Sequence, residues 1–133
     1  MADTFRLTLA QLNPVVGDLA GNIAQARQAH AAGARAGADL VALPEMFATG
    51  YQAMDLGRKP AFVEDVMARV EALAHDLAEG PALGIGAPYV EGTNLYNAYW
   101  ILDGGKVTAV VKKQALPNDS VFDEKRVYHP AEP

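Results

Sequence analysis

The distribution of apolar and polar positions predicts an alternation of strands and helices. Residues 5–12 alternate between the two kinds up to Asn13 and Pro14, which is typical of a strand that ends in a turn. Residues 39–43 form a nearly continuous apolar run, as expected of a strand that is covered on both faces. Residues 83–90 are apolar and contain glycine, which indicates a strand that another backbone approaches closely.

Two segments have helical periodicity. Apolar and small residues recur at three- and four-residue spacing from Ile23 towards Gly37, and Asn22 followed by Gln25 is typical of a capping box. Residues 60–77 show the clearer helical pattern, with a proline suited to the first turn. We therefore expect one helix between the first two strands and another after the second strand.

The later part of the chain predicts a hairpin. Residues 95–102 and 106–112 flank Asp103-Gly104-Gly105, where glycine supplies the positive φ that a tight turn requires. The element order is then strand, helix, strand, helix and three strands. This order favours an α/β fold with a mixed sheet.

The sequence after the hairpin predicts no further element. From Gln114 the chain becomes polar, and no helical pattern follows that would cover the last strands. A hairpin without a covering helix exposes apolar surface. We therefore interpret residues 1–133 as one incomplete domain.

Composition narrows the possible partners. A net charge of −5 with scattered Lys and Arg residues argues against nucleic acid. No apolar run approaches the roughly 18 residues of a membrane helix, and the N-terminus has no signal-peptide pattern, so we expect no membrane partner and a cytoplasmic location. The absence of cysteine excludes a disulfide and a thiol nucleophile within this chain, and the three histidines lack the spacing of a metal site.

Two charged residues are candidates for acid–base chemistry. Glu45 directly follows a buried strand and Pro44, so its carboxylate would be partly removed from water and could act as a general base. Lys113 ends the last strand, which should lie near Glu45, and could stabilise an oxyanion. The alternative for Glu45 is a helix-capping or solvent-facing glutamate after a proline turn, and the alternative for Lys113 is a solvated basic strand end. Glu124 belongs to a charged run, which is more often a solvated surface.

Several separated motifs resemble the carbon-nitrogen hydrolase (nitrilase-like) family. These motifs lie at residues 9–18, 43–51 and 113–117, so the resemblance spans nearly the whole chain. More narrowly, residues 116–126 resemble the amidase domain of glutamine-dependent NAD synthetases. The resemblance implies the first half of a nitrilase-like α-β-β-α sandwich, truncated before the nucleophilic cysteine.

The resemblance also implies a Glu-Lys-Cys triad. In it, Glu45 matches the general base, Lys113 matches the cationic stabiliser, and the cysteine comes from a later strand that this chain lacks. Glu124 matches a glutamate that supports the triad. The implied substrate is L-glutamine, and the implied enzyme is a homo-oligomer. ATP and magnesium would be used by a missing synthetase domain, so this fragment should bind no cofactor. The fragment alone should be inactive.

The implied glutamine pocket lies beside Tyr51 and Phe122. Asp119 stands where the family often has an aromatic residue, so this aspartate could meet the substrate ammonium group instead. Two other hypotheses remain open from the sequence. One is a stand-alone amidase or nitrilase, and the other is a binding module without catalytic function.

Overall fold

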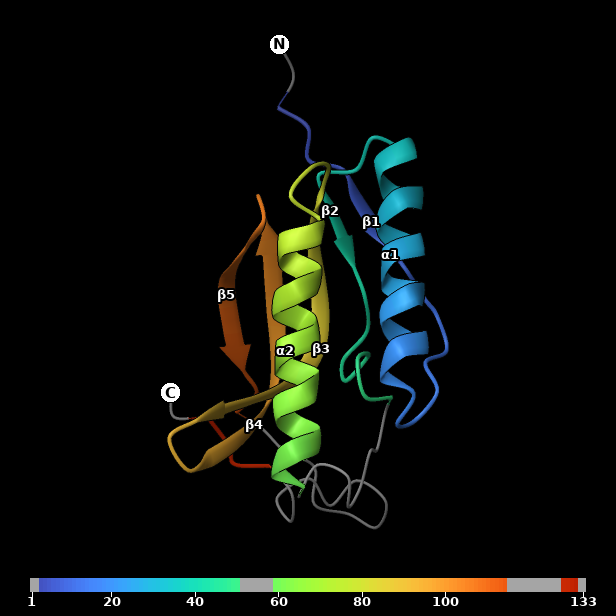
Figure 1. The fold of residues 1–133 in the computed structure, drawn as a ribbon. Helices are drawn as coiled ribbons and strands as arrows, with labels where there is room; N and C mark the ends of the chain where they lie inside the picture. The colour runs from blue at the N-terminus through green and yellow to red at the C-terminus, as the bar shows by residue number, and fades with distance from the viewer. Residues whose placement is uncertain (1–2, 51–58, 115–127, 132–133) are drawn as a thin grey trace.

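The computed structural model describes residues 3–50, 59–114 and 128–131 and confirms the expected order of elements (Figure 1). In chain order they are β1 (Leu7–Leu9), α1 (Leu19–Arg35), β2 (Leu40–Ala42), α2 (Pro60–Asp76), β3 (Ala82–Glu91), β4 (Asn94–Asp103) and β5 (Lys106–Lys112). The first strand is shorter than predicted, because only three of its residues pair with β2.

The strands form one mixed sheet, as the element pattern predicted, and lie in the order β1-β2-β3-β4-β5. The pairs β1–β2 and β2–β3 are parallel, whereas β3–β4 and β4–β5 are antiparallel. Both helices lie side by side on the same face of the sheet (Figure 1). The result is one helical layer on one sheet, which is the α/β arrangement expected of half a sandwich.

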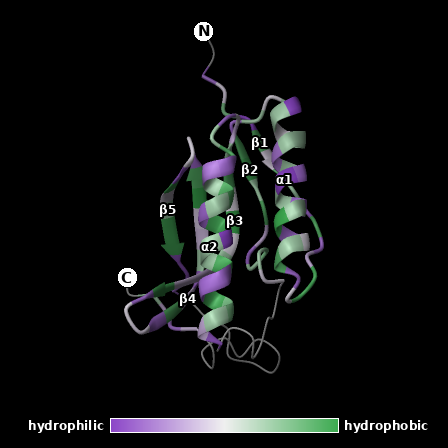
Figure 2. Ribbon diagram, in the orientation of Figure 1, coloured by the Kyte–Doolittle hydropathy of each residue, from purple (hydrophilic) through white to green (hydrophobic). Residues whose placement is uncertain are grey.

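The core lies between the helices and the sheet. It includes large strand residues such as Trp100 and Ile85, and α1 contributes small residues such as Ala26 beside larger ones such as Ile23. Gly33 of α1 has no room for a Cβ, because that atom would collide with the Val41 side chain of β2. Figure 2 shows polar residues on the outer sides of both helices and apolar ones along much of the sheet.

The start of α1 differs from the sequence prediction. The N-cap is Asp18, whose Oδ1 accepts from the Gly21 amide at 3.1 Å. Asn22 lies inside the first turn and is fully buried. Its side chain accepts from the Val15 amide and donates to the carbonyls of Val15 and Ala48, at 2.8, 2.8 and 3.0 Å. The predicted capping box is therefore wrong, because Asn22 fastens two loops to the helix instead.

The sequence predicted that no helix covers the last strands, and this prediction is wrong for one face of the sheet. Helix α2 packs against β3 and β5, and Val107 and Val110 of β5 contact the core. The opposite face carries exposed apolar side chains, including Leu9 and Val111 at 70% and 61% exposure. No helix within the described residues is long and apolar enough to span a bilayer.

Candidate active site

Glu45 lies on a loop that crosses the sheet directly after β2. The loop is fastened to β3 on both sides of Glu45, since the Gly86 amide donates to the Pro44 carbonyl at 3.3 Å and the Ala48 amide donates to the Gly86 carbonyl at 3.0 Å. A Cβ at position 86 would collide with the backbone of Met46. Glycine is therefore required where the loop meets the strand, as the sequence predicted for a close backbone approach.

The residue after Glu45 has an unusual backbone conformation. Met46 has a φ of 55°, the only positive value among the described residues other than glycine. Its side chain is buried, and the Thr49 hydroxyl donates to its carbonyl at 3.3 Å. A non-glycine residue in this region is strained by the order of 1 kcal/mol, and such residues cluster at functional sites. The turn at Met46 follows Glu45 directly, before the chain contacts β3 again at Ala48.

Lys113 follows β5 directly and is fixed by its backbone on two sides. Its amide donates to the Asn97 carbonyl of β4 at 2.8 Å, and its carbonyl accepts from the Ala131 amide at 2.9 Å. The Lys113 ammonium donates to Glu45 Oε1 at 2.7 Å. The structure therefore brings together the two residues that the sequence singled out, although they lie on different segments of the chain.

This ion pair is partly open to solvent. The side chain of Lys113 is 28% exposed and that of Glu45 is 43% exposed, so the described residues remove the carboxylate from water less than the sequence suggested. The pair borders a cavity of about 320 Å³, whose other lining residues come from β4 and β5. They are Asn97, Ala98, Tyr99 and Val111.

Asn97 is a site residue that the sequence analysis missed. Its side-chain amide donates to Glu45 Oε1 at 2.7 Å, and only 2% of the residue is exposed. A signal was present in the sequence, because Asn97 is a polar residue in the middle of an apolar strand. A buried amide requires a hydrogen-bond partner, and here the carboxylate of Glu45 is one.

Tyr99 supports the strand end that precedes Glu45. Its hydroxyl donates to the Leu43 carbonyl at 2.8 Å. Burial raises the pKa of Tyr99, an effect that the hydrogen bond to Leu43 partly opposes. The phenol therefore stays protonated, and able to donate, throughout the neutral range.

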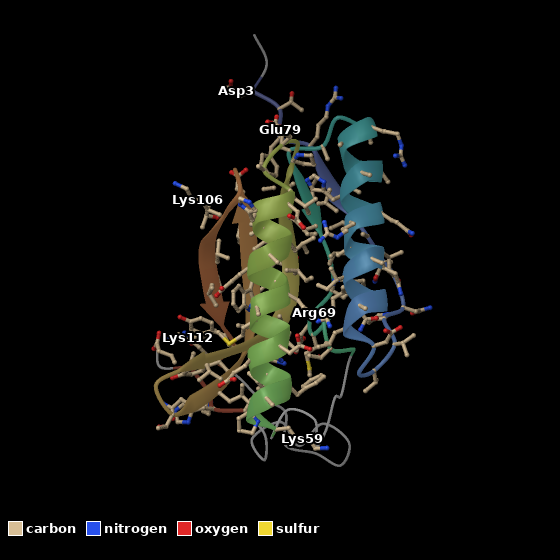
Figure 3. The ribbon with its side chains drawn as sticks, viewed as in Figure 1. Asp3, Lys59, Arg69, Glu79, Lys106 and Lys112 are labelled. Carbon is tan, nitrogen blue, oxygen red and sulfur yellow. The ribbon has the colours of Figure 1, made fainter. Side chains whose placement is uncertain are left out.

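Lys112 points to a different part of the molecule. Its ammonium donates to Glu91 at 3.1 Å and lies 4.8 Å from the centre of the Tyr96 ring. The hydrogen bond to Glu91 raises the pKa of Lys112. Figure 3 shows Lys112 near the β3–β4 hairpin. Neighbouring strand residues point to opposite faces, which explains why only one of the two lysines reaches Glu45.

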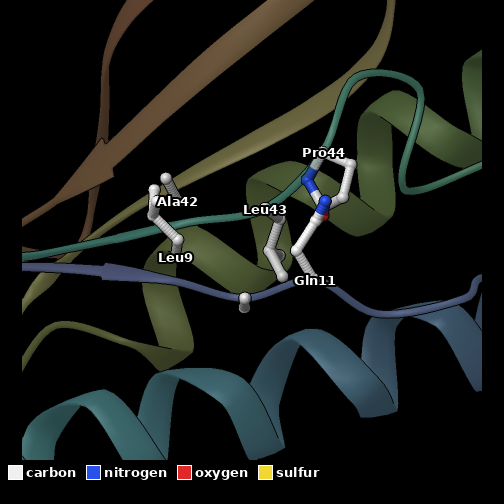
Figure 4. Close-up of a pocket in the computed structure, with 6 residues that line it drawn as sticks. Leu9, Gln11, Ala42, Leu43 and Pro44 are labelled. Carbon is white, nitrogen blue, oxygen red and sulfur yellow. The ribbon is translucent and has the colours of Figure 1, made fainter.

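Other polar and hollow features lie outside the Glu45–Lys113 pair in the part of the chain that the structure describes. His30 of α1 is buried, with Nε2 2.8 Å from the Pro81 carbonyl. The described residues contain no group of three or more His, Asp or Glu side chains that could hold a metal ion. A second cavity of about 210 Å³ lies beside β1 and β2 and is mainly apolar (Figure 4).

Four predicted site residues lie outside the described residues. They are Tyr51, Asp119, Phe122 and Glu124.

Comparison with known proteins identifies relatives along almost the whole chain. Residues 6–132 match the family model described as "Carbon-nitrogen hydrolase". A glutamine-dependent NAD(+) synthetase from Rhodobacter capsulatus is 59% identical over 128 residues, which are 96% of this chain and 23% of that protein. The chain thus spans about a quarter of the length of the curated relatives it matches.

Solved structures have the same fold. The glutamine-dependent NAD+ synthetase from Acinetobacter baumannii, determined in complex with adenosine diphosphate, has a TM-score of 0.88 and 30% identity, over 97% of this chain and 24% of that one. An amidase from Nesterenkonia sp. has a TM-score of 0.82 and 26% identity, over 97% of this chain and 49% of that one. In one structure of the Nesterenkonia amidase, acrylamide is added to its active-site cysteine.

Proposed function

Because the chain belongs to the carbon-nitrogen hydrolase family, we propose that it forms part of the glutamine-hydrolysing site of a glutamine-dependent NAD synthetase. The observation that carries the proposal is the contact between Glu45 and Lys113, a carboxylate on the loop after β2 and an ammonium at the end of β5 that lie 2.7 Å apart. The 59% identity to a synthetase supports this parent enzyme over other members of the family. We call the full-length protein of which we propose this chain to be a part the parent protein.

In the proposed reaction, Glu45 is the general base. It takes the proton of a cysteine thiol, and the resulting thiolate forms a bond to the side-chain amide carbon of glutamine. The Lys113 ammonium stabilises the negative charge that develops on the amide oxygen. The carbon–nitrogen bond then breaks, the leaving group takes up the proton and departs as ammonia, and water hydrolyses the thioester to glutamate. The thiol comes from the part of the parent protein outside this chain, which contains no cysteine.

The four residues outside the described ranges complete the proposal. Glu124 supports the Glu45–Lys113 pair, and Tyr51 and Phe122 line the glutamine pocket. Asp119 would there meet the substrate ammonium group. These assignments rest on the family resemblance of the motifs in which the residues occur.

The proposed reaction that uses the ammonia takes place in another part of the parent protein. Ammonia reaches a part that uses ATP to amidate nicotinic acid adenine dinucleotide. The complex of the Acinetobacter baumannii relative with adenosine diphosphate supports nucleotide binding in such a parent. We place ATP and Mg²⁺ in that part, as the family resemblance of the chain implies. We also propose a cytoplasmic, homo-oligomeric parent protein.

The test compares two nitrogen sources in the parent protein. Glu45→Gln and Lys113→Met should each lower glutamine-dependent NAD synthesis at least about 100-fold, the usual contribution of a general base or an oxyanion donor. Synthesis from ammonium chloride should persist, because it bypasses glutamine hydrolysis. Lys112→Met is the matched control and should retain glutamine-dependent synthesis, since Lys112 contacts Glu91 and not Glu45.

Two results would reject the proposal. Wild-type glutamine-dependent rates in Glu45→Gln would remove Glu45 from the reaction. A parent protein that hydrolyses amides but makes no NAD from either nitrogen source would be a stand-alone amidase, the second hypothesis. That hypothesis has structural support, because the amidase fold matches with a TM-score of 0.82.

A further inference from the structure

Two donors converge on one oxygen of the candidate base. Asn97 Nδ2 and Lys113 Nζ each lie 2.7 Å from Glu45 Oε1. Within the part of the chain that the structure describes, no hydrogen bond to Glu45 Oε2 is formed. The two oxygens of the carboxylate are therefore in different environments.

The two donors differ in rigidity. Lysine is a flexible side chain with an ammonium that can reorient, and the Lys113 side chain is 28% exposed. Asn97 is 2% exposed and lies on β4, which is paired on one side with β3 and on the other with β5. Its own carbonyl is bound by the Lys113 amide. Of the two donors, Asn97 has the more fixed position.

The burial of Asn97 indicates why an amide occupies this position. An apolar residue would satisfy the strand pattern, whereas a buried amide costs free energy unless it is hydrogen-bonded. An amide also holds a carboxylate without neutralising its charge. A glutamate has three side-chain torsions. Confining an exposed glutamate to a single orientation costs free energy, because conformational entropy is lost. A rigid neutral donor supplies that confinement.

We propose that Asn97 is a positioning residue that fixes the orientation of Glu45 and thereby selects Oε2 as the proton-accepting oxygen. With Oε1 held by Asn97 and Lys113, the new O–H bond forms at Oε2. The S–H bond of the attacking cysteine breaks, and its electron pair stays on sulfur. This inference rests on the proposed function, because the thiol belongs to the parent protein.

The test uses Asn97 variants of the parent protein. Asn97→Ala removes the donor, and Asn97→Leu removes it with little change of shape and no new charge. Each variant should lower kcat for glutamine-dependent NAD synthesis by about 10- to 100-fold, since misplacement of a catalytic group by about 1 Å has an effect of this size. The KM for glutamine should stay within about twofold, and synthesis from ammonium chloride should stay at the wild-type rate.

Asn94→Ala is the matched control. Asn94 lies on the same strand but is exposed, and its contact with the Tyr96 hydroxyl is long at 3.4 Å. This variant should leave the rates of NAD synthesis from glutamine and from ammonium chloride unchanged. If Asn97→Ala does not fold, Asn97→Leu carries the test, with thermal unfolding to confirm that the variant is folded.

A double substitution separates positioning from a general structural role. If Asn97 acts through Glu45, then Asn97→Ala should slow alkylation of the active cysteine by iodoacetamide in the wild-type background. In a Glu45→Gln background the same substitution should have no further effect, since coupled residues are not additive. Equal effects in both backgrounds would overturn the inference.

The outcomes distinguish the inference from the proposed function. A wild-type parent protein that does not use glutamine refutes both. An active wild type whose folded Asn97 variants keep the wild-type kcat refutes the inference alone. Equal loss of glutamine- and ammonium-dependent synthesis would also refute it, because a positioning residue for Glu45 affects only glutamine hydrolysis.

Discussion

At the scale of single residues, hydrogen bonds to backbone carbonyls hold the strand ends that carry the site. Tyr99 is the clearest example, because its hydroxyl binds the carbonyl of Leu43, two residues before Glu45. Asn22 has a similar function at the other end of the loop, where it binds the carbonyl of Ala48. Neither contact involves the candidate catalytic groups directly, yet both restrict the segment that presents Glu45.

Removal of the Tyr99 hydroxyl should have a pH-dependent effect on stability. Burial raises the pKa of Tyr99 in the folded state above its unfolded value of about 10. The stability that the phenol contributes is therefore complete below about pH 10 and is lost as the pH rises through the folded-state pKa. Tyr99→Phe should lower the free energy of unfolding by about 0.5–1.5 kcal/mol near neutrality.

The measurement is the Tm of the wild-type and Tyr99→Phe parent proteins between about pH 8 and pH 11. The difference between them should shrink at the alkaline end, because only the wild type loses the contribution of the phenol. A difference that stays constant over this range would contradict the assignment of the shift to Tyr99.

At the scale of elements, the site depends on the contact between the Glu45 loop and β3. Gly86 allows this contact because it has no Cβ, and the amide and carbonyl of Gly86 bind the two sides of the loop. An added methyl group would collide with backbone atoms of Met46, which cannot move aside as a flexible side chain would. The geometry of Glu45 is therefore coupled to the identity of residue 86.

Gly86→Ala should weaken both stability and activity. We expect a loss of roughly 1–3 kcal/mol in the free energy of unfolding, the usual cost of overpacking, together with a decrease in glutamine-dependent synthesis. Gly92→Ala is a useful contrast, because its φ of 63° strains an alanine although nothing lies within 4 Å of the added Cβ. Chemical denaturation measures the stability of both variants, and NAD synthesis from glutamine and from ammonium chloride measures their activity. Unchanged glutamine use in Gly86→Ala would contradict the coupling.

Local patterns predicted the elements well, but contacts between distant segments were harder to predict. The hairpin was visible because Gly104 and Gly105 interrupt an apolar pattern, and the end of β2 was marked by Pro44. The N-cap was misassigned because Asn22 fits a capping pattern as well as Asp18 does. Asn97 and Glu45 are 52 residues apart in sequence, and their contact depends on the pairing of β2 with β3 and of β3 with β4, which no local pattern specifies.

At the scale of the whole molecule, the chain holds two charged groups of the proposed site but no nucleophile. Glu45 and Lys113 are brought together within the chain, whereas a thiol is absent from all 133 residues. The face of the sheet opposite the helices carries Leu9 and Val111, both largely exposed. The cysteine of the proposed site would come from the remainder of the parent protein.

The isolated chain should therefore hydrolyse no glutamine. Neither Glu45 nor Lys113 can replace a thiolate as the covalent nucleophile in the proposed reaction. Ammonia release from glutamine should equal the buffer blank for the purified chain and exceed it for the parent protein at equal concentration. Turnover by the isolated chain, free of contaminating enzyme, would show that the reaction does not need cysteine.

The mixed sheet also has a consequence for the order in which the site is assembled. Strands β3, β4 and β5 are neighbours in sequence and close through short turns, whereas the parallel pairing of β2 with β3 must wait for the chain to cross through α2. Local contacts form faster than distant ones. We therefore expect Asn97 and Lys113 to meet early in folding and Glu45 to arrive last. Pulse-labelled hydrogen exchange that protects the Leu43 amide before the Lys113 amide would reverse this order.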